Sequence, residues 1–396
     1  MSERSYVIYG PTAWDGHRNA AHNYARALAT RHRVLYVEPP LSPLGPFRYG
    51  LGPGTWPGLV AVARRRPRTR EGLEVFAPLA LPPVENPRMR ARSLPLVRAQ
   101  LAGAVARAEL RRPVVVGWRG LAELAGVAGE RLRVAVIMDH PAAGAALLDR
   151  DPADLEDRAL SLCRSADLIC ATSHAVRDLL ADRGWPSALL PFGFPGDLAA
   201  AFDSAPAPGE YDRLPRPLLG YTGSVDDRLD FGLVTRVADR FRGGSIVFVG
   251  ATSPRLSASA RDALASRPNI HLLGARGRSE LPGYIRHLDV ALMPYGDDLF
   301  TRHQSPMKTW EYLYAGPPIV GTASPELRHY PPPLVNYADD ADRFIRLVEH
   351  ALAHPADGRE QRRRFALANT WEARAAALDE LVDRALADSP AERGAA

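Results

Sequence analysis

The stretch LLGYTGSVDDRLDFGLVTRVADRFRGGSIVFVGA at residues 218–251 sets the fold class of this 396-residue chain. It begins and ends with short, nearly all-apolar segments of the kind that form buried parallel strands, and a helix-length segment separates them. The same alternation continues to residue 354, and it also runs through the first half of the chain from SYVIYG at 5–10. The pattern predicts parallel sheets covered by helices on both faces.

Two such alternating halves predict two Rossmann-like α/β domains, at residues 1–200 and 211–370. The linker is expected in APAPGEYDRLPRP (205–217), where proline, glycine and charge replace the apolar pattern. Ligands of open parallel sheets bind outside the carboxyl ends of the strands, and we expect that edge to face a cleft between the domains. Residues 41–95 are dense in Pro, Gly and Arg, and we expect an irregular insertion there.

Composition points to an ordinary globular chain, with 46% hydrophobic and 24% charged residues. No apolar run approaches the length of a membrane span, and the N-terminus passes directly into a strand, so no signal peptide is expected. Cys163 and Cys170 lack the spacing of a disulfide framework. They are predicted to be buried free thiols in a reducing compartment, which favours the cytoplasm.

The segment SPMKTWEYLYAGPPIVGT (305–322) contains the only lysine of the chain, among 50 Lys and Arg residues. Ser305 is predicted as an N-cap and Pro306 as the first helical residue, which places Lys308 in the first turn. A helix N-terminus beside a compact ammonium favours a diphosphate, and a carboxylate at Glu311 can accept both hydroxyl protons of a ribose. The alternative is a solvated Lys308–Glu311 ion pair.

This segment resembles the donor-site motif of GT-B glycosyltransferases of the retaining family-four type, in the branch that acts on cell-envelope and exported polysaccharides. Other segments resemble that family in the same order along the chain: WDGHRNAAHNYARALATRHRVLYVEPP, LCRSADLICATSHAVRDLL, LLPFGF, LLGYTGSVDDRLDF and NTWEARAAALDELV. The resemblance implies a GT-B fold whose last helix, at about 371–390, crosses back to the first domain. It also implies sugar transfer from a nucleoside-diphosphate sugar to an acceptor hydroxyl with retention of configuration.

The resemblance implies that Glu311 holds the ribose and that Lys308 meets the diphosphate, together with Arg228. The full set of expected donor-binding residues is Gly16, Gly223, Ser224, Arg228, His303, Gln304, Ser305, Pro306, Met307, Lys308 and Glu311. For Arg228 the alternative is an ion pair with a neighbouring carboxylate, Asp226, Asp227 or Asp230. His303 stands where the broader family has a glutamate that contacts the donor sugar.

Candidate residues in the first domain lie in two places. Asp139 and His140 close the strand in RVAVIMDHP and are expected, with Arg228 and Lys308, to form the catalytic set. His17, Arg18 and His22 follow Gly16 and are expected on the acceptor side. The alternatives are a satisfied polar pair at a strand end and an exposed loop.

No metal-binding motif and no basic run with interleaved aromatics is present, so we expect neither a metal cofactor nor nucleic acid as a partner. The expected partners are a nucleotide sugar and a glycan, lipid-linked or small natural-product acceptor. The arginine-rich region 63–98 could contact anionic lipid, or it could be a solvated surface. Two other functions stay open: a nucleotide-sugar epimerase of the same fold, and a non-catalytic GT-B subunit that partners an active homologue.

Overall fold

The structure is a computed structural model that describes residues 4–16, 18–42, 68–81, 87–145 and 151–388. It divides into two compact units, and each is described here by itself. The first unit consists of Met1–Thr172, Arg177–Leu190 and Arg374–Ala396, and the second of Ser173–Val176 and Pro191–Ala373.

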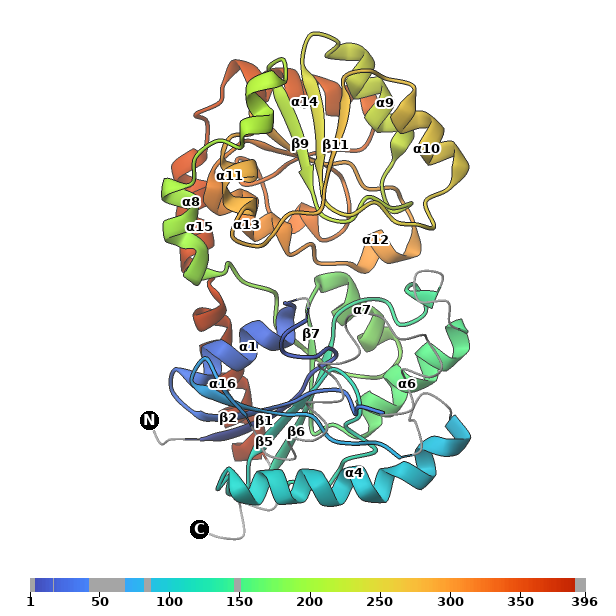
Figure 1. Cartoon of the computed structure of the whole chain (residues 1–396), viewed down its shortest axis with the longest axis vertical. Helices are drawn as coiled ribbons and strands as arrows, with labels where there is room; N and C mark the ends of the chain where they lie inside the picture. The colour runs from blue at the N-terminus through green and yellow to red at the C-terminus, as the bar shows by residue number, and fades with distance from the viewer. Residues whose placement is uncertain (1–3, 17, 43–67, 82–86, 146–150, 389–396) are drawn as a thin grey trace. The chain divides into compact units, whose positions relative to one another are not determined.

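The first unit contains an eight-stranded sheet in the order β3-β4-β2-β1-β5-β6-β7-β8 (Figure 1). All pairs are parallel except the edge pair β3–β4. The strands are β1 Ser5–Tyr9, β2 Arg33–Val37, β3 Arg68–Arg70, β4 Leu73–Phe76, β5 Val114–Gly117, β6 Leu132–Ile137, β7 Leu168–Ala171 and β8 Ala188–Leu189. The helices are α1 Ala20–Ala29, α4 Pro87–Arg107, α6 Pro152–Arg164, α7 His174–Asp182 and α16 Trp371–Asp388.

The second unit contains a six-stranded, wholly parallel sheet in the order β11-β10-β9-β12-β13-β14. Its strands are β9 Leu218–Thr222, β10 Ser245–Val249, β11 Ile270–Gly274, β12 Val290–Met293, β13 Ile319–Thr322 and β14 Asn336–Ala338. Its helices are α8 Ala199–Ser204, α9 Phe231–Arg240, α10 Ala258–Ala265, α11 Leu281–Arg286, α12 Leu299–His303, α13 Lys308–Ala315, α14 Ala341–Ala353 and α15 Arg359–Ala368. Three 3₁₀ turns cover Gly196–Leu198, Gly209–Arg213 and Leu327–His329.

The strand order of the second sheet reverses between β9 and β12. When the six strands are numbered in chain order from β9, their order across the sheet is 3-2-1-4-5-6, which is the doubly wound Rossmann arrangement. Helices α9 and α10 lie on one side of this sheet and α11 and α13 on the other (Figure 1). The strands carry the apolar runs that this burial requires, and all five residues of β9 and of β10 are buried. The predicted fold class, two α/β domains with parallel sheets, is therefore confirmed.

Two local expectations differ from the structure. The segment 205–217, expected as a linker, belongs entirely to the second unit, where Tyr211 is buried and donates a hydrogen bond to the carbonyl of Tyr284 (3.1 Å). The expected irregular insertion at 41–95 contains the β3–β4 pair and the beginning of α4, which continues through Pro95. The rest of that insertion, residues 43–67 and 82–86, lies outside the described residues.

The C-terminal helix α16 starts in the second unit and belongs to the first from Arg374 onward. Its Asp379 is buried, and its carboxylate accepts hydrogen bonds from three residues of the first sheet and its edge. Arg4 Nη1 lies 3.1 Å from Asp379 Oδ1, His32 Nε2 lies 2.8 Å from Oδ2, and the Tyr6 hydroxyl donates to Oδ1. These bonds attach the end of the chain to its beginning.

Both cysteines are buried free thiols, as the sequence predicts. Burial raises the pKa of Cys163 to about 11 and that of Cys170 to about 12, so neither is a thiolate near neutral pH. Among the described residues, no helix combines the length and apolar character needed to cross a bilayer.

Candidate functional site

The candidate site of the second unit lies at the carboxyl ends of β9 and β12, where the strand order reverses. The loop 223–228 follows β9, and a turn after β12 leads through α12 to α13. Hydrogen bonds join the two connections, because Gly296 N donates to the Arg228 carbonyl (2.8 Å) and Asp230 N donates to the Pro294 carbonyl (2.9 Å). Such a reversal point is where open α/β sheets bind nucleotides.

Gly223, the first residue after β9, approaches the lone lysine very closely. Its φ of 128° lies in a region that residues with a Cβ rarely adopt. A Cβ atom at this position would lie 2.6 Å from Lys308 Nζ. The backbone conformation therefore favours glycine here, and the amine of Lys308, at the end of a flexible side chain, lies directly against the backbone of the loop.

Lys308 is the first residue of α13, and its side chain is half-buried. The ammonium lies 3.6 Å from the ring centroid of Tyr221 and 5.4 Å from that of Tyr295, a cation–π arrangement. It forms no hydrogen bond or ion pair with any described residue. Desolvation, followed by repulsion from Arg228, lowers the pKa of Lys308 well below its usual value, and the charges of Asp226 and Glu311 oppose this shift.

Glu311 lies one turn further along α13 and is also half-buried. Burial raises the pKa of its carboxyl, although the positive charges of Arg278 and Lys308 oppose the shift. The carboxylate accepts no hydrogen bond from the described part of the chain and forms no ion pair with Lys308. The alternative of a solvated Lys308–Glu311 pair is thus absent, and both charged groups are available to a ligand.

Tyr312, one turn after Lys308 on the same face of α13, fixes the helix to β9. Tyr312 is fully buried, and its hydroxyl oxygen accepts hydrogen bonds from the backbone N–H of Thr222 (2.7 Å) and from the Thr222 hydroxyl (3.1 Å). The Tyr221 hydroxyl donates to the carbonyl of Ser224 (3.2 Å) and so shapes the same loop. These bonds fix the position of the start of α13, which carries Lys308, relative to the loop that contains Gly223.

Arg228 forms an ion pair with Asp226, which is one of the three pairs that the sequence offered as the alternative to diphosphate binding. Its guanidinium donates to both carboxylate oxygens of Asp226, at 2.7 and 2.6 Å, and its ring contact is Phe300, 5.1 Å from the guanidinium carbon. Burial alone lowers the pKa of Arg228, but the hydrogen bonds and charge of Asp226 outweigh it and the net shift is upward. Asp227 binds Ser257 and Asp230 caps α9, so neither competes for Arg228.

The predicted start of the lysine helix is wrong by two residues. The helix begins at Lys308 with Met307 in the cap position, and Ser305 makes no capping bond. The chain instead enters through a tight turn in which Thr309 N donates to the Pro306 carbonyl (3.1 Å), so Pro306 and Met307 precede the helix.

His303 and Gln304 precede this turn and lie next to the start of α13. His303 ends α12, and its carbonyl accepts a hydrogen bond from the Ser173 hydroxyl (2.8 Å). Gln304 is 6% exposed, and its side-chain nitrogen has no partner among the described residues. A buried amide donor of this kind is suited to a ligand acceptor atom.

In the first unit, the loop after β1 and the start of α1 contain Gly16, expected to bind the donor, and the residues expected on the acceptor side. Gly16 is exposed, Arg18 donates to the Asn23 side chain, and His17 lies outside the described residues. His22 is fully buried: it forms a capping box with Asn19, its Nε2 lies 3.1 Å from the Ala13 carbonyl, and its ring stacks on Tyr36. This environment gives His22 a structural role in starting α1.

Asp139 and His140 follow the carboxyl end of β6, as the sequence predicts. His140 is 9% exposed, and its Nδ1 accepts a hydrogen bond from the backbone N–H of Ala142 (3.2 Å). Asp139 is half-buried. Their catalytic role stays a prediction.

The described part of the arginine-rich region 63–98 is largely engaged within the protein. Arg68 binds Glu38 (3.1 Å), and Arg98 donates to the carbonyls of Glu123 (2.7 Å) and Ala125 (3.1 Å). The triplet at 64–66 lies outside the described residues, and contact of the region with lipid stays a prediction.

One group in the described chain has the geometry of a metal site. The ligand atoms of His350, His354 and Asp357 lie within 4.8 Å of one another, and all three residues are exposed. The group is at the end of α14 and includes none of the candidate site residues. The expectation that the protein needs no metal stays a prediction.

Sequence reasoning missed Tyr221, Tyr312 and Arg278. The two tyrosines were visible as the aromatic residues of LLGYTGS and KTWEYLY. Their contacts, however, join segments that lie about 90 residues apart, which no local pattern shows. Arg278 follows β11 and acts on Glu311 only through its charge.

No protein-family model matches the chain. Over 159 residues, which are 39% of this chain and 40% of the relative, the chain is 28% identical to a Bacillus subtilis (strain 168) protein assigned as the teichuronic acid biosynthesis glycosyltransferase TuaH. The match thus spans well under two thirds of that relative.

Solved structures match over nearly the whole chain. The α,α-trehalose 6-phosphate synthase from Burkholderia multivorans gives a TM-score of 0.65 at 16% identity, covering 98% of this chain and 100% of that chain. The UDP-GlcNAc 2-epimerase from Neisseria meningitidis, solved with UDP-GlcNAc, gives 0.51 at 10% identity, covering 96% and 100%. The fold of this chain is therefore one that glycosyltransferases and a nucleotide-sugar epimerase share.

Proposed function

We propose that this protein is a glycosyltransferase that moves a sugar from a nucleoside-diphosphate sugar to an acceptor hydroxyl. The observation that carries the proposal is the group formed by Gly223, Lys308 and Glu311 at the reversal point of the second sheet. An amine without an ion-pair partner and a carboxylate without a hydrogen-bond donor lie one helical turn apart there, within the described residues. The partial match to TuaH supports transfer over the other activities of the fold.

The diphosphate would bind against Lys308 and the backbone of Gly223. Its charge would supply the counter-ion that Lys308 lacks and would raise the lowered pKa of the amine. All other Lys and Arg residues of the chain are arginines, and this proposal accounts for the lysine at 308. A guanidinium stays charged when it is buried, whereas an amine can lose its proton in the empty site. The lowered pKa of the amine reduces the cost of burying it without a ligand.

The ribose would bind at Glu311, whose ionised carboxylate can accept both hydroxyl protons. Arg228 is held by Asp226 and would add positive charge near the leaving diphosphate without direct contact. In the transfer, the bond from the anomeric carbon to the diphosphate oxygen breaks and a bond to the acceptor oxygen forms. The acceptor proton goes to the departing phosphate, and Asp139 and His140 are proposed to contact sugar or acceptor.

Retention of configuration, independence from metal and a cytoplasmic location are parts of this proposal. Retention follows only from the motif resemblance. The acceptor is proposed to be a glycan, a lipid-linked glycan or a small natural product.

The first test is a thermal-shift series with UDP, GDP, dTDP and ADP on wild type, Lys308→Ala and Glu311→Ala. A ligand at about 100 times its Kd stabilises by about 2.7 kcal/mol. One diphosphate should stabilise wild type, and both variants should lose that shift. Arg242→Ala, an exposed cation of the same unit, is the control and should keep it. If all four proteins respond equally, the site assignment is wrong.

The two other functions give different products. An epimerase consumes the nucleotide sugar without an acceptor, so product analysis with and without acceptor separates it from a transferase. A non-catalytic subunit shows no turnover with any donor and copurifies with a second transferase.

A further inference from the structure

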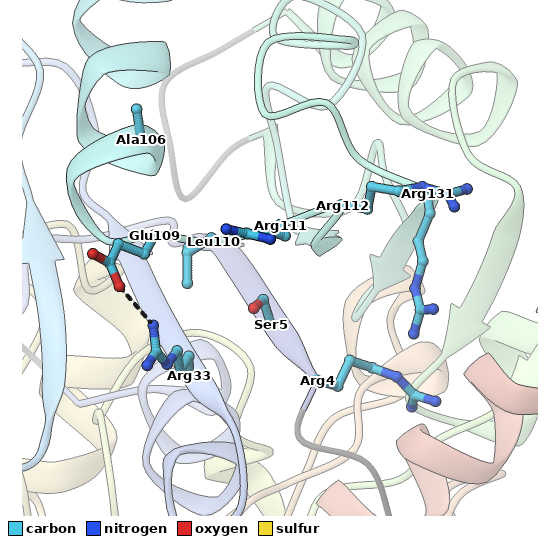
Figure 2. Close-up of a pocket in the computed structure, with 9 residues that line it drawn as sticks. All are labelled: Arg4, Ser5, Arg33, Ala106, Glu109, Leu110, Arg111, Arg112 and Arg131. Atoms are coloured by element: carbon cyan, nitrogen blue, oxygen red, sulfur yellow. Dashed lines mark hydrogen bonds and ion pairs between the residues drawn. The ribbon is translucent and has the colours of Figure 1, made fainter.

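A hollow of about 760 Å³ opens on the first unit, and its lining includes neither Asp139 nor His140 (Figure 2). Its charged lining consists of Arg4, Arg33, Glu109, Arg111, Arg112 and Arg131. We call it the arginine pocket. Five cations against one carboxylate make its charge strongly positive.

The pocket follows from the sheet itself. Four neighbouring strands, in the order β2-β1-β5-β6, each carry an arginine at or shortly before their first residue. Arg33 begins β2, Arg4 precedes β1, and Arg131 precedes β6, while the pair 111–112 lies just ahead of β5. Because parallel strands begin at the same edge, these side chains gather around Ser5 (Figure 2). This is the amino edge, opposite to the edge that carries Asp139 and His140.

Two of the five arginines already have carboxylate partners. Arg4 binds Asp379 (3.1 Å) and Asp383, both outside the pocket lining, and Arg33 lies 3.4 Å from Glu109. Arg4 and Arg33 are therefore held in place at the base of the pocket and at its side.

The other three arginines have no such partners. The guanidinium groups of Arg111, Arg112 and Arg131 form no hydrogen bond or ion pair within the described chain. The Nε of Arg131 is moreover buried without an acceptor. A buried donor without a partner can be satisfied by an acceptor atom of a ligand or by an ordered water. The pocket thus has three uncompensated positive charges.

The turn between α4 and β5 presents two of these residues. Glu109 and Arg112 have φ values of 53° and 44°, in the left-handed region that non-glycine residues seldom occupy. Two such residues within four positions are held there by the surrounding structure, since the adjoining Leu110 is buried. The turn therefore fixes the backbone from which the exposed side chains of Arg111 and Arg112 extend.

We propose that the arginine pocket binds a phosphate-bearing anion, either a free phosphorylated small molecule or the headgroup of a lipid. Guanidinium groups bind phosphate through paired N–H donors, which is the geometry that several convergent arginines supply. The volume is that of a small-molecule site. A second hollow, of about 530 Å³ in the second unit, is lined by the carboxylates Asp227, Asp230 and Asp297 and has the opposite charge.

The test is calorimetric titration with sodium pyrophosphate, made in the full-length Lys308→Ala chain so that the proposed donor site cannot contribute. The pocket variant is Arg111→Gln/Arg112→Gln/Arg131→Gln. The matched control, Arg164→Gln/Arg213→Gln/Arg242→Gln, removes the same charge from exposed positions. We expect the pocket variant to lose at least tenfold in affinity and the control to lose less than twofold.

A second arm measures sedimentation with phosphatidylcholine vesicles that contain phosphatidylglycerol. A tenfold loss confined to pyrophosphate identifies a free phosphorylated ligand, and a loss confined to vesicles identifies a headgroup; either supports the proposal. Equal behaviour of the pocket variant and the control in both assays overturns it, as does the absence of any binding by the unsubstituted pocket. If the triple variant does not fold, Arg111→Gln and Arg131→Gln are measured singly and interpreted in the same way.

Discussion

Replacing Gly223 by alanine tests the candidate site with a single methyl group. At a φ of 128°, a residue with a Cβ costs about 1–3 kcal/mol of stability. For a domain of this size, about 2–4 °C of melting temperature are lost per kcal/mol, so the variant should melt about 2–12 °C lower. The new methyl would also lie 2.6 Å from Lys308 Nζ, and the amine, as the flexible partner, must move away.

The displaced amine should weaken diphosphate binding. A hydrogen bond to a charged group contributes about 1.5–3 kcal/mol, so losing it corresponds to a roughly 10- to 150-fold rise in Kd. The assays are thermal melting and calorimetry with the diphosphate that stabilises wild type. Gly243→Ala is the matched control, because its Cβ would meet no atom within 4 Å. Equal melting and equal Kd in the two variants would refute the assignment of Gly223 and Lys308 to one site.

Three further predictions concern the charges and the histidine described above. The lowered pKa of Lys308 means that the unfolded chain binds more protons than the folded chain up to about pH 10.5, so the stability of wild type rises with pH in that window. Lys308→Met should therefore be more stable than wild type at pH 7 in guanidinium unfolding, with an advantage that shrinks toward pH 10; a constant difference would contradict the pKa shift. Arg228→Ala should cost about 3 kcal/mol because it leaves Asp226 buried without its partner, and Asp226→Asn in the same chain should restore part of the loss in urea unfolding. His22→Ala should cost about 1 kcal/mol through the lost capping box and leave diphosphate affinity unchanged, and an affinity loss in calorimetry would return this residue to the site.

Much of the fold was predictable because its strands are short, apolar and regularly spaced. The segments LLGYTGS and SIVFVGA correspond to β9 and β10, and the predicted helix between them is α9. Such segments are strongly determined locally, since a buried parallel strand tolerates few polar residues. The two-domain architecture followed from repetition of the pattern.

Irregular regions were predicted less well. Residues 41–95 were expected to form an irregular insertion, and proline usually begins a helix and does not continue one. In the structure, helix α4 nevertheless starts at Pro87 and continues through Pro95. Similarly, Ser305 has the side chain of a good N-cap, yet the close approach of Lys308 to the β9 loop places the helix start two residues later. Tertiary contacts overrode local preference in this case.

The candidate site divides in the same way. Lys308 and Glu311 were predictable because their spacing on one helix is a local property. The partner of Arg228 could be limited to three neighbouring aspartates but not chosen among them. The arginine pocket could not be predicted, because its members are spread from Arg4 to Arg131 and meet only through strand order.

The attachment of α16 to the first unit has a consequence for biosynthesis. Asp379 follows Arg4 by 375 residues, so the carboxylate that binds Arg4, Tyr6 and His32 is translated long after those residues. Domains usually fold in order as they leave the ribosome. In this protein the first unit is completed only after the second has been translated, and a nascent chain stalled before residue 374 keeps a buried tyrosine and histidine without their acceptor until synthesis resumes.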